Sequence, residues 1–237
     1  MTTIDRPHTA PDGIDRSQLV SFDLYRDIHK GIRTELFATT VEAGRTDPAD
    51  RAGRAALADR VDALAALLVS HAHHEDAAID PVLEVHRPDL AEAVTTDHAV
   101  LDARLAAIVD RTRSAVDAPA GHRAQLHWAH LDLASFTSAY LAHQDLEERV
   151  VMPALDQAIG LEALLGLHQS IIGAIPPDEL AESLALMLPA MNVEDRVEML
   201  AGMRASAPPE VFAGVLGLAA SVLAGPDHDV LVRRLEV

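Results

Sequence analysis

Cysteine is absent from the 237 residues of this sequence. Its absence excludes a disulfide framework, a metal site with thiolate ligands and a thiol nucleophile. A chain without cysteine fits a reducing cytoplasm, where we expect this protein to reside. Aromatic residues are also scarce, at 3%, although hydrophobic residues reach 49%. The core must therefore consist mainly of alanine, leucine and valine, and the first two favour helices over sheets.

Basic residues are few, because 19 lysines and arginines stand against 37 acidic residues and give a formal net charge of -18. A surface this acidic repels nucleic acids and anionic membranes, so neither is expected as a partner. No uninterrupted apolar run reaches the length of a membrane span. Residues 1–13 are polar and include two prolines, unlike a signal peptide. These absences predict a soluble cytoplasmic protein.

Apolar residues recur at steps of three and four along four long stretches, which is the pattern of amphipathic helices. We predict helices over about residues 17–42, 50–85, 88–114 and 122–159. Short connections with glycine or proline separate them. The predicted fold is all-α: an antiparallel, up-down-up-down four-helix bundle over residues 17–159. Residues 1–16 are predicted to form a flexible N-terminal arm, and residues 161–237 a small C-terminal all-helical appendage.

Histidine is abundant, with 13 copies, and it is the commonest metal ligand. Several histidines belong to an internal repeat. Residues 71–83 read HAHHEDAAIDPVL and residues 143–155 read HQDLEERVVMPAL. Both copies contain a histidine, a glutamate four residues later, a second acid directly after it, and a proline near the helix end. The matched pairs are His71 with His143, Glu75 with Glu147, Asp76 with Glu148, and Pro81 with Pro153.

The spacing of the repeat suits metal binding, because residues four apart lie one turn apart on the same face of a helix. The histidine and the glutamate of each copy can therefore reach one metal region together, and both lie on the apolar stripe of their helix. A buried carboxylate without a partner is costly, so a bound cation best explains two of them beside several histidines. The other two helices each supply one inward histidine. The predicted ligands are His29, His71, Glu75, His98, His143 and Glu147.

This ordered set of ligands resembles the hemerythrin-like, or HHE cation-binding, domain family. The resemblance covers about residues 17–159 and is specific, because single histidines alternate with His-x-x-x-Glu pairs and the proline is repeated. It implies a non-haem centre of two iron ions, bridged by the two glutamates and by an oxo or hydroxo group, and capped by the histidines. Nitrogen and carboxylate ligands also suit manganese and zinc.

One position departs from the pattern of oxygen-carrying hemerythrins. In the family pattern that this sequence resembles, the third helix of the oxygen carriers has two histidines spaced by four. The second of these positions is Asp102 here. Water, Asp102 or a tyrosine could fill the open position, and Tyr25 and Tyr140 each lie near a predicted ligand in the sequence. His74 is a further candidate beside the ligand face. The acid that follows each repeat glutamate is interpreted as a surface carboxylate or one that orients a histidine.

The missing histidine shifts the predicted function away from reversible oxygen transport. We predict a di-iron protein that binds or reacts with a small redox ligand, namely O2, hydrogen peroxide (H2O2) or nitric oxide (NO), and senses or detoxifies it. As an enzyme, it would be a di-iron oxidoreductase with peroxidase, catalase-like or NO-reducing activity. The alternatives are a di-iron oxidase or oxygenase of an organic substrate, and an iron-binding or iron-sensing protein without turnover. A homodimer formed through the C-terminal helices is a further prediction.

Overall fold

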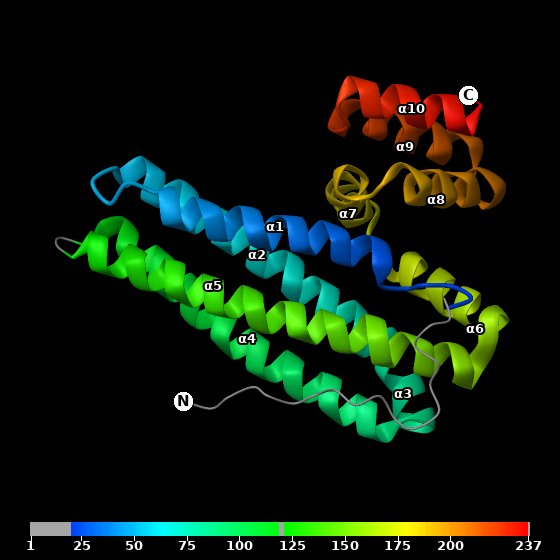
Figure 1. Ribbon diagram of the computed structural model, residues 1–237, viewed down its shortest axis with the longest axis horizontal. Helices are drawn as coiled ribbons and strands as arrows, with labels where there is room; N and C mark the ends of the chain where they lie inside the picture. The colour runs from blue at the N-terminus through cyan, green and yellow to red at the C-terminus, as the bar shows by residue number, and fades with distance from the viewer. Residues whose placement is uncertain (1–19, 119–120, 237) are drawn as a thin grey trace. The chain divides into compact units, whose positions relative to one another are not determined.

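The computed structural model describes residues 20–118 and 121–236, and the predicted N-terminal arm lies outside these residues. The described chain is helical and contains no strand, which confirms the all-α prediction. Figure 1 shows the helices in their order along the chain. Their bounds are α1 Arg26–Arg45, α2 Arg51–Ala78, α3 Asp80–His86, α4 Pro88–Asp117, α5 His122–Leu146, the π-helical segment η1 Glu147–Val151, α6 Met152–Ala174, α7 Pro177–Ala190, α8 Val193–Ser206, α9 Pro209–Val222 and α10 Gly225–Leu235.

The described residues form two compact units that do not follow the order of the chain. The first contains residues 20–25 and Phe37–Ile171, and the second contains Arg26–Leu36 and residues 172–236. Helix α1 is therefore divided between the two units. Its first half groups with the C-terminal helices, and its second half groups with the long helices α2, α4 and α5. The prediction placed the whole first helix in one bundle over residues 17–159 and did not expect it to be divided in this way.

In the first unit, α2 packs along α4 and α4 packs along α5, and Figure 1 shows α4 beside α5. The predicted apolar stripes form the interior, where Leu57, Leu133 and Phe136 are fully buried. The second half of α1 joins these helices through a hydrogen bond of 2.9 Å between the hydroxyls of Thr40 and Thr137. Apolar residues every three or four positions thus hold the helices of this unit together.

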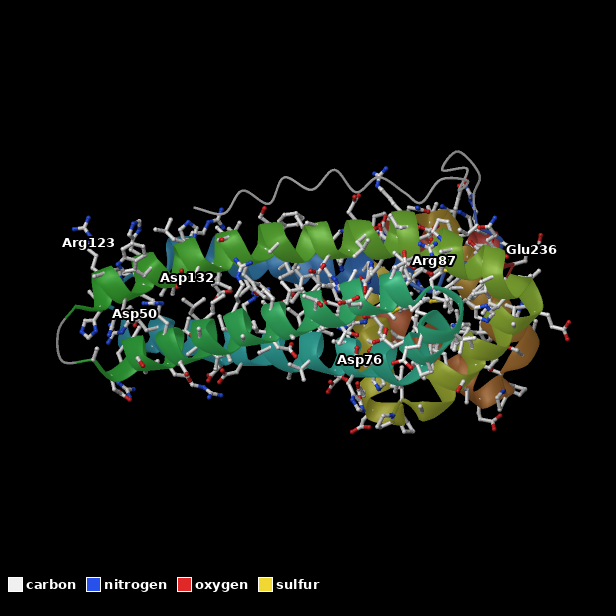
Figure 2. The ribbon with its side chains drawn as sticks, turned by 90° about the horizontal axis from the view of Figure 1, so that it is seen from below. Asp50, Asp76, Arg87, Arg123, Asp132 and Glu236 are labelled. Carbon is white, nitrogen blue, oxygen red and sulfur yellow. The ribbon has the colours of Figure 1, made fainter. Side chains whose placement is uncertain are left out.

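The candidate ligands lie toward one end of these long helices. The Asp50 carboxylate accepts a hydrogen bond of 3.0 Å from the Ala52 N–H and begins α2, as an N-cap residue does. Figure 2 shows Asp50 and Arg123 at the same end of the helices, and Asp76 well toward the opposite end. Because Glu75 precedes Asp76, the repeat residues of α2 lie near the end at which α3 begins.

The first helix begins at Arg26, not near residue 17 as predicted. Residues 20–25 are not helical, and the Asp23 carboxylate accepts a hydrogen bond of 3.0 Å from the Tyr25 N–H. A local bond from a side chain to the backbone competes with the helical hydrogen-bond pattern. The helix therefore starts only after this turn.

The second predicted helix, over residues 50–85, is two helices in the structure, α2 and α3, separated by the turn residue Ile79. Pro81 explains the break, because proline has no N–H to donate and its ring clashes with the carbonyl four residues earlier. At the matching place in the second copy of the repeat, Pro153 follows the π-helical segment η1. The regular helix is thus interrupted near the repeated proline in both copies, at Ile79 in the first and over Glu147–Val151 in the second.

The stretch His122–Ala174 is long and apolar enough to cross a membrane by length and composition, with a mean hydropathy of 1.5 over its most apolar window. This corrects the prediction from the sequence that no such stretch exists. A stretch with a few charged residues can still have a high mean hydropathy. The prediction considered only uninterrupted apolar runs and therefore missed it. The stretch is not regular, since η1 lies within it and Gly160 has non-helical angles (φ 72°, ψ 173°). Buried core helices meet the same criterion.

The second unit has an apolar core of its own, in which Leu188 and Leu200 are fully buried. Asn192 begins α8, because its side-chain oxygen accepts hydrogen bonds from two N–H groups of the first helical turn. An ion pair between Lys30 and Asp195 ties the first half of α1 to α8. The C-terminal helices are therefore a packed unit that includes part of α1.

We expect Gly160→Ala to lower the free energy of unfolding by about 1 kcal/mol, because a φ of 72° is unfavourable for a residue with a Cβ. Gly166→Ala is the matched control on the same helix. It should raise stability by about 0.5–1 kcal/mol, since alanine is the better helix former. Apart from the local backbone, a Cβ at either position meets no atom within 4 Å, so contacts with other parts of the chain do not contribute. Chemical denaturation of both variants tests this, and equal effects would contradict it.

Candidate metal centre

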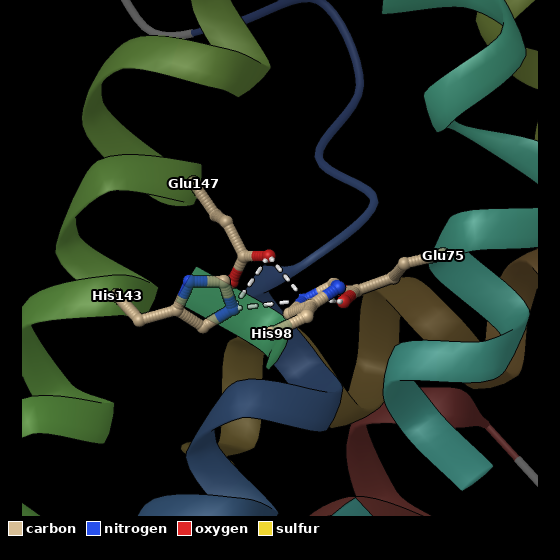
Figure 3. A group of neighbouring side chains, drawn as sticks. All are labelled: Glu75, His98, His143 and Glu147. Carbon is tan, nitrogen blue, oxygen red and sulfur yellow. Dashed lines mark hydrogen bonds and ion pairs between the residues drawn. The ribbon is translucent and has the colours of Figure 1, made fainter. Parts of the chain in front are cut away.

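Four side chains of metal-ligand type converge inside the first unit: Glu75 from α2, His98 from α4, His143 from α5 and Glu147 from η1. Each offers one ligand atom, and these four atoms lie within 4.8 Å of one another. Figure 3 shows the four side chains pointing toward one another. Their exposed fractions are 5%, 7%, 3% and 1% in that order, so protein encloses the whole group.

The two imidazole rings present the same nitrogen to the centre of the group. The Nε2 atoms of His98 and His143 lie 3.1 Å apart. His143 Nε2 also lies 3.1 Å from Oε1 of Glu147, one helical turn later. His98 Nε2 lies 3.6 Å from Oε2 of Glu75 and 3.8 Å from Oε1 of Glu147. Both rings thus direct Nε2 to a point between the two carboxylates.

The first copy of the repeat forms the equivalent pair, because His71 Nε2 lies 3.1 Å from Oε1 of Glu75. The second copy has the same separation between His143 and Glu147. The two oxygens of Glu75 therefore face different histidines, Oε1 toward His71 and Oε2 toward His98. A carboxylate in this position can join two cation sites.

Three predicted candidates are not members of this group of four side chains. His29 is completely buried, on the half of α1 that belongs to the second unit. Asp102 lies on α4 at an exposed position, and His74 lies on α2 and is half-buried. Their roles as ligands or as neighbours of ligands stay predictions from the sequence.

The outer nitrogen of each ring faces a carboxylate from a neighbouring helix. His98 Nδ1 lies 2.8 Å from Oδ1 of Asp76 on α2, which confirms the interpretation of Asp76 as an orienting carboxylate. His143 Nδ1 lies 3.6 Å from Oδ2 of Asp97 on α4. Such carboxylates orient a ligating ring and keep the proton on Nδ1, so that Nε2 is free for a metal. Asp97 could not be recognised from the sequence, because it belongs to no repeat and only helix packing brings it to His143.

Both histidines favour protonation in the absence of a metal. Burial by itself lowers the pKa of His98, but the carboxylates of Glu75 and Asp76 outweigh it and raise the pKa to about 9. Burial likewise lowers the pKa of His143, and Glu147 with Asp97 outweighs it and raises the pKa to about 10. Two protonated rings would direct N–H groups at each other across 3.1 Å. A cation removes this conflict, because it accepts a lone pair from each Nε2.

The two candidate tyrosines are buried close to the group. Burial, together with the negative charges of Glu147 and Glu75, holds the pKa of Tyr25 and of Tyr140 well above the usual value for a phenol. The ring centroids of Tyr140 and His143 are 5.7 Å apart, with the rings in an edge-on arrangement. The phenols are therefore neutral unless a cation offsets the carboxylates.

A buried set of imidazoles and carboxylates on packed helices defines a class of protein, namely helical proteins built to hold a metal cation. The family model described as the hemerythrin HHE cation-binding domain matches residues 20–155. The chain belongs to this family, which confirms the resemblance stated from the motifs. No curated protein and no solved structure matches the chain.

The metal-free protein should lose stability as the pH rises. The pKa values of His98 and His143, about 9 and about 10, lie above the unfolded value of about 6.5. Their contribution is fully present below pH 6.5, and it is lost as the pH rises through these folded values. The melting temperature of His143→Gln should therefore differ most from that of the wild type at about pH 6 and least at about pH 10. A difference in melting temperature that does not change with pH would contradict this. His73→Gln, at an exposed position, is the control, and its melting temperature should equal that of the wild type at each pH.

Asp76→Ala should weaken metal binding by about 10- to 100-fold, because His98 loses the carboxylate that orients it. Asp76→Asn should weaken metal binding less, since an amide oxygen can still accept a hydrogen bond from Nδ1 of His98. Competition with a coloured chelator measures both affinities. Asp110→Ala, at an exposed position of α4, should match the wild type. Equal affinities for all four proteins would show that Asp76 does not support the site.

Proposed function

We propose that this protein holds a non-haem di-iron centre and binds or reacts with a small redox ligand, namely O2, peroxide or NO. We further propose that the centre lies in an up-down-up-down bundle formed by α1, α2, α4 and α5. Membership of a cation-binding family and the buried group of glutamates and histidines support a metal site. The position of Glu75 between two histidines supports two metal ions rather than one.

The donor set fits the proposed metal. Imidazole and carboxylate ligands suit iron, manganese and zinc, whereas the chain offers no thiolate. Glu75 and Glu147 are proposed to bridge the two positions, each reaching histidines with its oxygens. His98 and His143 would ligate through Nε2, and His71 would act in the same way from the first copy of the repeat. His29 is proposed as the sixth ligand because of its place in the order of the motifs.

Iron would supply the electron-transfer chemistry. The residues of the chain would orient its ligands and enclose it. Asp76 hydrogen-bonds the outer nitrogen of His98, which directs its Nε2 inward, and Asp97 lies 3.6 Å from the outer nitrogen of His143. The four convergent donors are at most 7% exposed, so bulk water is largely excluded. An enclosed centre favours ligands of two or three atoms over a large organic substrate. This enclosure is why we propose O2, peroxide or NO as the ligand.

The wild-type protein loaded with iron should contain about two metal ions per chain, as a two-metal site requires. Glu75→Ala should lose most of this metal, because the carboxylate reaches histidines on both sides. The metal should also raise the melting temperature of the wild type, and less so that of the variant. Elemental analysis and thermal denaturation measure these effects, with His73→Gln as the control. One metal ion or none in the wild type would overturn the di-iron proposal.

The loaded protein should then be mixed with NO and, separately, with hydrogen peroxide. A stable, reversible NO adduct without turnover supports a sensing or binding role. Catalytic loss of peroxide that disappears in Glu75→Ala supports detoxification. A protein that responds to neither, while it retains two metal ions, would contradict the proposed ligand class.

A further inference from the structure

One fully buried polar side chain on α5 has no role in the site described so far. Gln144 is 0% exposed, and neither its amide oxygen nor its amide nitrogen has a hydrogen-bond partner among the described residues. An amide buried in this way costs about 1–3 kcal/mol. A group that lowers stability to this extent calls for a specific explanation, such as a bound molecule that is present only in the working protein.

The place of Gln144 on its helix directs it to the candidate metal centre. It follows the ligand His143 directly, lies four residues after Tyr140 and lies three residues before the ligand Glu147. Residues three and four apart are neighbours on one helical face. Both neighbours are buried with the group, and the ring of Tyr140 lies 5.7 Å from that of His143. The amide therefore lies on the buried side of α5, beside the ligands along the helix.

The internal repeat shows that the fold does not need an amide at this position. In the first copy, the residue matched to Gln144 is Ala72, and the residue matched to Tyr140 is Leu68. Both are buried. The two copies thus share their metal ligands, but only the second adds an amide and a phenol to the inward face. At these two buried positions the second copy has polar side chains, and the first copy has aliphatic ones.

We propose that the Gln144 amide is the hydrogen-bonding group that holds the small ligand on the α5 side of the metal centre. The amide N–H would donate to an acceptor atom of the ligand, and the amide oxygen could accept from a proton of the ligand or from an accompanying water. The inference rests on the proposed function, since it names the protein group that the ligand of that centre contacts. It also assigns the ligand to one side of a nearly symmetric site.

The test compares Gln144→Met with the wild type, because methionine has a similar volume and no polar atoms. Azide, a small anion with acceptor atoms at both ends, serves as the probe. Both proteins are loaded with iron, oxidised and titrated with azide by absorption spectroscopy. We expect equal metal content and about tenfold weaker azide binding in the variant, as the loss of one hydrogen bond predicts. Gln144→Ala, which copies the residue at position 72, should show the same loss.

A second measurement uses the metal-free protein and separates binding from folding. If the amide is unpartnered until a ligand arrives, the melting temperature of Gln144→Met should equal or exceed that of the wild type. A lower melting temperature would mean that the fold itself satisfies the amide, and it would overturn the inference. Gln125→Met is the matched control, because it is the same change on the same helix, far along the chain from the ligands. It should leave azide affinity unchanged.

The possible failures are distinguishable. A wild type that takes up no metal overturns the proposed function and this inference with it. A wild type that takes up metal and binds azide no more tightly than Gln144→Met overturns the inference alone. Equal weakening by Gln125→Met would also overturn it, because the effect would then not depend on the site.

Discussion

The burial of two glutamates against two imidazoles is the constraint on which the first unit depends. Glu75 and Glu147 are 5% and 1% exposed, and a carboxylate leaves water only at a large cost in free energy unless a positive charge compensates it. His98 and His143 supply that charge when they are protonated, and a metal cation supplies it more completely. The donors come from α2, α4, α5 and η1. These helices must therefore keep one register relative to each other for the charges to meet.

The two copies of the repeat are alike in their metal ligands and different in their surroundings. Each has a histidine Nε2 at 3.1 Å from its glutamate. After the glutamate, the first copy has a turn at Ile79 and the second has the π-helical segment η1. The inward position before the glutamate is Ala72 in one copy and Gln144 in the other. Metal binding explains the likeness, and the ligand contact that we propose for Gln144 would explain the difference.

Helix α1 links the two compact units. Its first half forms ion pairs with α8, through Lys30 with Asp195 and Arg26 with Glu198. Its second half bonds to α5 through Thr40 and Thr137. The predicted ligand His29 lies on the half of α1 that belongs to the second unit. The cytoplasmic location and a dimer through the C-terminal helices stay predictions from the sequence.

The sequence alone determined the helical class, the inward stripes and the repeated histidine–glutamate pairs, because all of these follow from spacing within one helix. The predicted beginning of α1 was wrong, because the hydrogen bond from the Tyr25 N–H to Asp23 acts against the apolar pattern. The turn at Ile79 was not predicted, because the ring of Pro81 interrupts a helix that the apolar pattern continues. Only the tertiary structure brought Asp97 to His143 and showed that Gln144 is buried without a partner. These relations join residues of different helices or depend on complete burial. They are set by how α2, α4 and α5 pack, which no spacing along a single helix contains.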